Sequence, residues 1–123
     1  MPAPEVTAAD PTCLFCRIVA GEVPARFVHR NQTLIAFHDV NPQAPVHILV
    51  VPVRHIASAA DLTQADGSLL GQLFDTAAQL GRDLGVAETG YRMVINTRDH
   101  GGQTVHHLHV HLLGGRRMGW PPG

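Results

Sequence analysis

The sequence predicts an α+β domain, with an antiparallel sheet of about five strands, one long helix and one short helix. Short runs of β-branched and aliphatic residues are separated by glycine, proline and asparagine, a pattern typical of strands joined by turns. Residues 66–84 repeat leucine and alanine at helical spacing. The chain has 123 residues, 45% of them hydrophobic and 15% charged, and shows no internal repeat. One domain is therefore expected.

The chain has two parts of different composition. Residues 1–11 contain two early prolines and few side chains that could be buried, so we expect a flexible N-terminal segment. Residues 12–123 form the single domain. Its C-terminal tail, residues 114–123, is too rich in glycine and proline for a regular element.

The first elements are a short helix and a hairpin. Apolar residues at helical spacing follow Thr12, which suits a helix start, and Gly21 stops the pattern. Residues 27–29 and 33–38 then read as strands. The turn-forming residues 30–32 join them.

The centre of the sheet and the long helix follow. After a rigid, proline-containing loop at residues 41–45, the β-branched run 47–51 predicts a central strand that is buried on both faces and ends at Pro52. The helix 66–84 has its polar residues on one side, and Gly85 is placed for a C-terminal cap.

Two further strands complete the sheet. Residues 91–96 form the first, a glycine-containing loop spans 96–104, and residues 107–113 form the last.

This last strand carries the strongest functional pattern in the chain. His107, His109 and His111 alternate with aliphatic residues, so in a strand they share one face, about 6.6 to 6.8 Å apart at Cα. Histidines at that spacing can serve a common anion or a metal. An adventitious metal-binding tract is the alternative, but aliphatic residues interrupt the run and glycines bound it. His106 should point away from this face.

The loop before the histidines contains the parts of an anion site. Gly101 and Gly102 lack the Cβ that would keep backbone N–H groups from a phosphate, and Thr104 adds a hydroxyl. A simple turn would use the same glycines. Together with the histidine face, however, the loop predicts a phosphate-sized site.

The two cysteines form one C-x-x-C pair, Cys13 and Cys16. In a reducing compartment such a pair indicates metal or redox chemistry. One pair is an incomplete metal site, and a free reduced pair is the alternative. The nine histidines supply candidates for further ligands.

Charge and hydropathy exclude several classes of partner. The formal net charge is −1 and the sequence pI is about 6.7, so we expect no general attraction to nucleic acid or to an anionic membrane. No apolar run approaches the roughly 18 to 20 residues of a membrane span, and the first residues do not resemble a signal peptide. We expect a cytoplasmic protein.

The histidine run resembles a known family. Residues 107–113 match the H-φ-H-φ-H-φ-φ signature of the histidine-triad superfamily. Residues 37–47, 90–96, 101–105 and 114–123 look like its Hint branch, the purine nucleoside phosphoramidases. The resemblance implies a histidine-triad-like fold and a homodimer in which two sheets join into one.

It also implies a reaction and the residues that perform it. The substrate would be a purine nucleoside 5′-phosphoramidate, and His109 would attack its α-phosphorus to form a nucleotidyl-histidine, from which water releases AMP or GMP. No metal is required for this chemistry. His111, Thr104, Asn96 and His47 match the other polar residues of the family's site.

The resemblance assigns the substrate contacts as well. Asp39 matches a carboxylate that binds the ribose, and Trp120, in the tail, would lie near the partner's site. The apolar base pocket would consist of Phe15, Ile18, Phe37 and Val40, and the backbone of Gly102, Gln103 and Val105 would lie along the phosphate.

Cys13 and Cys16 are similar to a pair found in bacterial members of the branch. By that resemblance they bind a structural zinc together with His55 and His107, which would fasten the N-terminal helix to the sheet.

Two other functions remain open. One is a dinucleoside polyphosphate hydrolase, which the Hint-like ending at Trp120 disfavours. The other is a nucleotide-binding regulatory or scaffold protein with weak turnover.

Overall fold

The computed structural model describes residues 9–123. Most of the predicted flexible segment, residues 1–8, lies outside the described residues. The elements in chain order are α1 (Leu14–Val19), β1 (Phe27–Arg30), β2 (Leu34–His38), β3 (Val46–Pro52), the short 3₁₀ helices η1 (Ala59–Asp61) and η2 (Gln64–Asp66), α2 (Gly67–Asp83), β4 (Tyr91–Val94) and β5 (Val110–Gly114).

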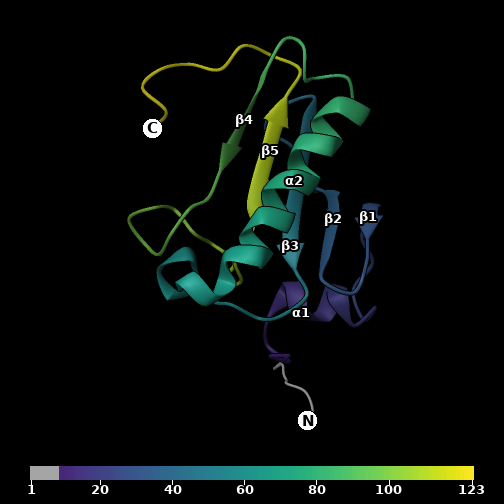
Figure 1. The fold of residues 1–123 in the computed structure, drawn as a ribbon, viewed down its shortest axis with the longest axis vertical. Coiled ribbons are helices and arrows are strands. Elements are labelled where there is room, and N and C mark those ends of the chain that lie inside the picture. Colours follow the sequence, from purple (N-terminus) through teal and green to yellow (C-terminus); the bar gives the residue numbers. More distant parts are fainter. Residues whose placement is uncertain (1–8) are drawn as a thin grey trace.

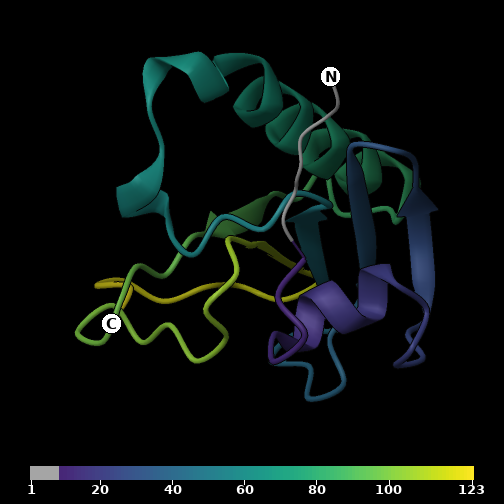
Figure 2. The same ribbon diagram turned by 90° about the horizontal axis from the view of Figure 1, so that it is seen from below.

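The five strands form one antiparallel sheet in the order β1-β2-β3-β5-β4. The long helix α2 crosses one face of this sheet (Figure 1). Seen from below, the short helix α1 lies on the opposite face, under β1 and β2 (Figure 2). The predicted α+β architecture and the central position of β3 are confirmed.

Each face of the sheet carries its own apolar cluster, because side chains alternate along every strand. On one face, Leu73, Ala77 and Leu80 of α2 pack against buried residues of β2, β3 and β5. On the other face, Phe15 and Ile18 of α1 pack against buried residues of β2 and β3. The second face is therefore the one that α1 partly covers.

The histidine strand begins later than the sequence predicts. It starts at Val110, not at His107, because the preceding backbone leaves the ladder: Leu108 N–H donates to the Ile56 carbonyl. The predicted alternation nevertheless holds. Leu108 and Val110 lie in the α2 cluster, whereas His107 and His109 are buried on the α1 face.

Other boundaries differ by a few residues. β4 ends at Val94, two residues before the predicted end. Helix α1 begins at Leu14, since Cys13 is in an extended conformation and its sulfur accepts the N–H of Cys16, as a helix cap does. The short helices η1 and η2, which Ser58 and Thr63 cap, are not among the predicted elements. No helix in residues 9–123 is both long and apolar enough to cross a bilayer.

Candidate functional site

A pocket of about 380 Å³ opens on the α1 face of the sheet. One end is apolar and the other carries hydroxyl, carboxylate and imidazole groups. The apolar lining includes Phe15, Ile18, Phe37, Val40 and Leu49, and the polar lining includes Asp39, His47, Thr104, His109 and His111. The arrangement suits a ligand with an apolar part and an anionic part.

His109 is buried and its ring is oriented by the backbone. Its Nδ1–H donates to the His107 carbonyl at 2.7 Å, so the neutral ring leaves Nε2 without a proton. The ring packs nearly perpendicular to that of Phe15, with ring centroids 5.0 Å apart. Burial lowers the pKa of His109, which keeps the imidazole neutral near pH 7. His109 therefore carries a lone pair suited to nucleophilic attack.

His111 has the opposite tautomer, which follows from a chain of hydrogen bonds. The backbone N–H of Gln43 donates to Nδ1 of His47 at 3.0 Å, so the proton of the neutral His47 ring is on Nε2. That Nε2–H lies 2.9 Å from Nδ1 of His111 and donates to it. The proton of His111 is consequently on its own Nε2, and His111 can donate a hydrogen bond to a ligand.

The electrostatic setting favours neutral rings for both of these histidines. Burial lowers the pKa of His47, and the carboxylate of Asp39, 3.4 Å from its Nε2, opposes part of that shift. Burial, followed by the neighbouring His109 and His47, lowers the pKa of His111 to about 4. At neutral pH the site thus offers one imidazole lone pair and one imidazole N–H.

Ten of the residues predicted for catalysis or substrate binding line this pocket. Val40 is almost fully exposed at its rim, and Asp39 is half-buried, with one oxygen accepting the N–H of Asn41. The pocket brings together Phe15, Ile18, Phe37, Asp39, Val40, His47, Thr104, Val105, His109 and His111.

Four predicted residues do not line the pocket: Asn96, Gly102, Gln103 and Trp120. Gln103 is buried, and its side chain accepts the N–H of Arg98 and donates to the carbonyls of Val105 and Ala57, which fastens the loop to the chain that follows β3. Trp120 is 83% exposed.

The sequence reading missed Gln43, whose backbone N–H fixes the His47 tautomer. Its position in the predicted rigid loop, four residues before His47, was the available indication.

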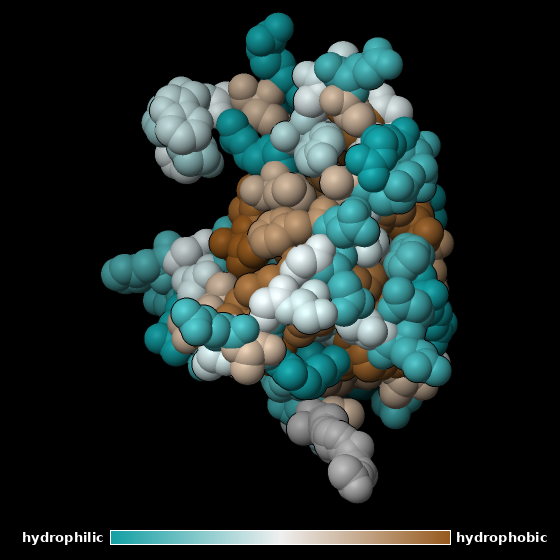
Figure 3. Space-filling model, in the orientation of Figure 1, coloured by the Kyte–Doolittle hydropathy of each residue, from teal (hydrophilic) through white to brown (hydrophobic). Residues whose placement is uncertain are grey.

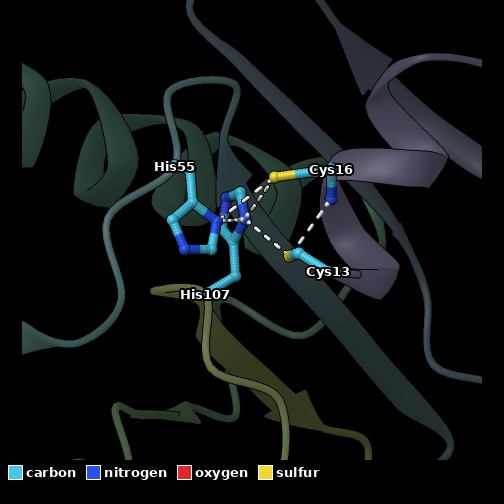
Figure 4. Close-up of side chains that lie close together, drawn as sticks. All are labelled: Cys13, Cys16, His55 and His107. Carbon is cyan, nitrogen blue, oxygen red and sulfur yellow. Dashed lines mark hydrogen bonds between the residues drawn. The ribbon is translucent and has the colours of Figure 1, made fainter. Parts of the chain in front are cut away.

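Cys13, Cys16, His55 and His107 converge at a second site (Figure 4). This site adjoins the first, because the Phe15 ring that lines the pocket also packs against the His107 ring. The cysteines come from the start of α1, His55 from the chain after β3, and His107 from the chain before β5. Four potential ligand atoms lie within 4.8 Å of one another. The closest separations run from 3.2 Å, between Cys16 Sγ and His55 Nδ1, to 3.6 Å, between Cys16 Sγ and His107 Nδ1.

These separations are close to those of a tetrahedral zinc site. Four ligands at tetrahedral angles, with Zn–S about 2.3 Å and Zn–N about 2.05 Å, would be about 3.3 to 3.8 Å apart. His107 Nε2–H donates to the Pro52 carbonyl at 2.8 Å, which leaves its Nδ1 as an electron-pair donor toward the thiols. Burial lowers the pKa of His107 to about 4, so this ring is neutral, as a metal ligand must be.

Comparison with known proteins identifies the family. The HIT domain family matches residues 20–118. An uncharacterized HIT-like protein of Synechococcus elongatus is 50% identical over 110 residues, 89% of this chain and 96% of that protein. A purine nucleoside phosphoramidase of Escherichia coli is 42% identical over 106 residues, 86% of this chain and 89% of that protein. The chain belongs to the HIT domain family.

Solved structures agree. A HIT family hydrolase of Legionella pneumophila superposes with a TM-score of 0.90 at 47% identity, covering 91% of this chain and 100% of that one. A Zn-bound histidine triad family protein of Mycobacterium smegmatis superposes with a TM-score of 0.73 at 27% identity, covering 91% of this chain and 80% of that one. The predicted histidine-triad resemblance and the fold are confirmed.

Proposed function

We propose that this protein hydrolyses the P–N bond of purine nucleoside 5′-phosphoramidates. The single observation that supports it most is the pair of opposite tautomers, with a lone pair on His109 and an N–H on His111, in one pocket with an apolar end. A P–N bond breaks when a nucleophile attacks phosphorus and the departing amine gains a proton. The similarity to the Escherichia coli purine nucleoside phosphoramidase supports this choice of substrate class.

The reaction would proceed in two steps. Nε2 of His109 forms a bond to the α-phosphorus, the P–N bond breaks, and the amine leaves with a proton taken from solvent. Water then attacks the nucleotidyl-histidine, which releases AMP or GMP, restores the imidazole and returns one proton to solvent. His111 Nε2–H would hydrogen-bond a phosphate oxygen, Asp39 the ribose, and the apolar end of the pocket would hold the purine.

The test is turnover of an adenosine 5′-phosphoramidate by the wild type, by His109→Ala and by His106→Ala. His106 is exposed and lies outside the pocket, which makes it a matched control. We expect a loss of at least about 10³-fold in kcat for His109→Ala, since the nucleophile is removed, and wild-type turnover for the control. Equal turnover by wild type and His109→Ala would refute the nucleophile. Tight AMP binding with negligible wild-type turnover would favour a regulatory protein.

We also propose that Cys13, Cys16, His55 and His107 bind a structural zinc. The separations of their ligand atoms support it, as does the Zn-bound relative of known structure. The ion would join α1 to two chain segments that are distant in sequence. When bound it supplies a closed set of four ligands and no open position, so it would stabilise the fold and take no part in the P–N chemistry.

A homodimer is the proposed assembly. β4 is an edge strand, and the exposed apolar side chains include Met93 on β4 and Phe74 on α2. Figure 3 shows an exposed apolar area on this side of the molecule, where β4 lies beside α2. Unpaired edge strands next to apolar surface favour pairing with a second copy. We expect a dimer by light scattering, weakened by Met93→Lys.

In such a dimer Trp120 would lie near the partner's pocket. It is 83% exposed, which leaves it free to make that contact. Deleting residues from Met118 onward should change substrate preference more than folding, and unchanged kinetics would count against this role.

A further inference from the structure

A second cavity, of about 560 Å³, lies between the start of β4 and the chain that follows β5. Its lining includes three arginines, Arg92, Arg116 and Arg117. Within residues 9–123, none of the three forms an ion pair with a carboxylate. A group of unneutralised guanidinium groups around a cavity favours an anionic ligand.

Backbone carbonyls hold two of these side chains in place. Arg92 Nη2 donates to the Gly119 carbonyl at 2.8 Å, and Arg116 Nε donates to the Gln43 carbonyl at 3.1 Å. Such bonds orient a guanidinium without cancelling its charge. Because each group has five N–H donors, donors remain for a carboxylate or phosphate.

The strand register places Arg92 close to the catalytic histidines. Arg92 is opposite Leu113, and Leu113 is opposite His47, so the three residues form one row on the same face of the sheet. Val94 is opposite His111, which makes Arg92 the diagonal neighbour of His111, about 7 to 8 Å away between backbones.

Arg92 lies on the side of His111 that is opposite to the apolar end of the first pocket. Helix α1 lies under β1 and β2, and among residues 9–123 loop and tail segments lie beneath β4 and β5 (Figure 2). If the purine occupies the apolar end next to α1, the group that leaves phosphorus must extend elsewhere. The charged side chain of β4 next to His111 is that of Arg92. Arg116 joins the two regions, because its partner Gln43 lines the first pocket.

We propose that Arg92, Arg116 and Arg117 form a leaving-group subsite that selects phosphoramidates whose amine part carries a carboxylate. This inference rests on the proposed P–N hydrolysis. The products are the nucleoside monophosphate and an amino acid, whose nitrogen takes the proton as the P–N bond breaks. The carboxylate is bound and does not react.

The test compares adenosine 5′-phosphoramidates that differ only in charge. The substrates carry 4-aminobutanoate or 6-aminohexanoate, and their matched controls carry the corresponding uncharged carboxamides. We expect wild type to prefer the carboxylates by about tenfold in kcat/KM, the factor that corresponds to about 1.4 kcal/mol. Arg92→Gln should reduce this preference to below about threefold, and Arg92→Lys should keep part of it.

Two more variants keep the test decisive. Arg117→Gln removes a guanidinium that has no side-chain hydrogen bond to residues 9–123, and it should also lower the preference. Arg82→Gln changes an exposed arginine of α2, on the other face of the sheet, and should keep both rates. Equal rates on carboxylate and carboxamide by wild type, at both lengths, would overturn the subsite and leave P–N hydrolysis intact. Failure to cleave any of the four substrates would overturn the proposed function itself.

Discussion

Removing zinc from the proposed site should lower thermal stability substantially. The ion would bridge residues 39 positions apart, Cys16 and His55, and residues 94 apart, Cys13 and His107. If free zinc is present at about 1,000 times its dissociation constant, binding stabilises the folded state by about 4 kcal/mol. For a domain of this size, each kcal/mol changes Tm by about 3 to 5 °C. Chelation should therefore lower Tm by about 12 to 20 °C.

Calorimetry of untagged protein, with and without a chelator, measures this shift, and metal analysis of the same samples gives the stoichiometry. Cys16→Ser should show the low Tm without a chelator, because one thiolate ligand is lost. His106→Ala is the matched control, since His106 is exposed and next to a proposed ligand. It should keep both the metal and the wild-type Tm.

Protein that contains less than about half an equivalent of zinc, with both thiols free, would show that the cluster is not a zinc site. A full equivalent of zinc without a change in Tm on its removal would show that the ion does not stabilise the fold.

Three further outcomes follow from the site. Burial lowers the pKa of His109 below 6.5, and the proposed attack requires the neutral imidazole. The value of kcat/KM should therefore be constant from pH 7 to 8 and fall on acidification, with a midpoint below pH 6.5. A midpoint above about pH 7 would contradict this. His47→Ala removes the donor to His111 and should lower kcat by about 10²-fold with little change in KM, measured by steady-state kinetics. Gly101→Ala should destabilise the protein by about 1 to 3 kcal/mol in urea unfolding, because a Cβ there would clash with the Thr97 carbonyl oxygen.

Periodicity was sufficient to predict most of the fold. The β-branched run of β3 and the leucine spacing of α2 reflect burial that the sequence itself records. The predicted start of β5 was wrong because the Leu108 N–H donates to the Ile56 carbonyl. This long-range contact leaves the alternation of side chains unchanged. The alternation of apolar and polar residues indicates which face of the sheet a side chain occupies. It does not indicate whether the backbone forms hydrogen bonds with a neighbouring strand.

Ten of the fourteen residues predicted for catalysis or substrate binding line one pocket, but the sequence did not predict the protonation of its histidines. The spacing of the histidines gives a shared face, and the lone pair on His109 depends on where the His107 carbonyl points. The N–H on His111 likewise depends on Gln43, which reaches His111 only through His47. The position of Arg92 next to His111 depends on the register of β4 against β5, and the residue pattern of neither strand determines that register.

His107 connects the two proposed sites within one residue. Its side chain faces Cys13 and Cys16, and its backbone carbonyl accepts the hydrogen bond of the His109 ring Nδ1–H. A zinc ion on the side chain would limit the movement of that carbonyl, and hence of the nucleophile's ring. The metal would then influence the rate by orientation alone. Zinc-depleted protein that remains folded should retain the His109-dependent reaction at a reduced kcat, whereas complete loss of turnover would mean that the ion acts in the chemistry.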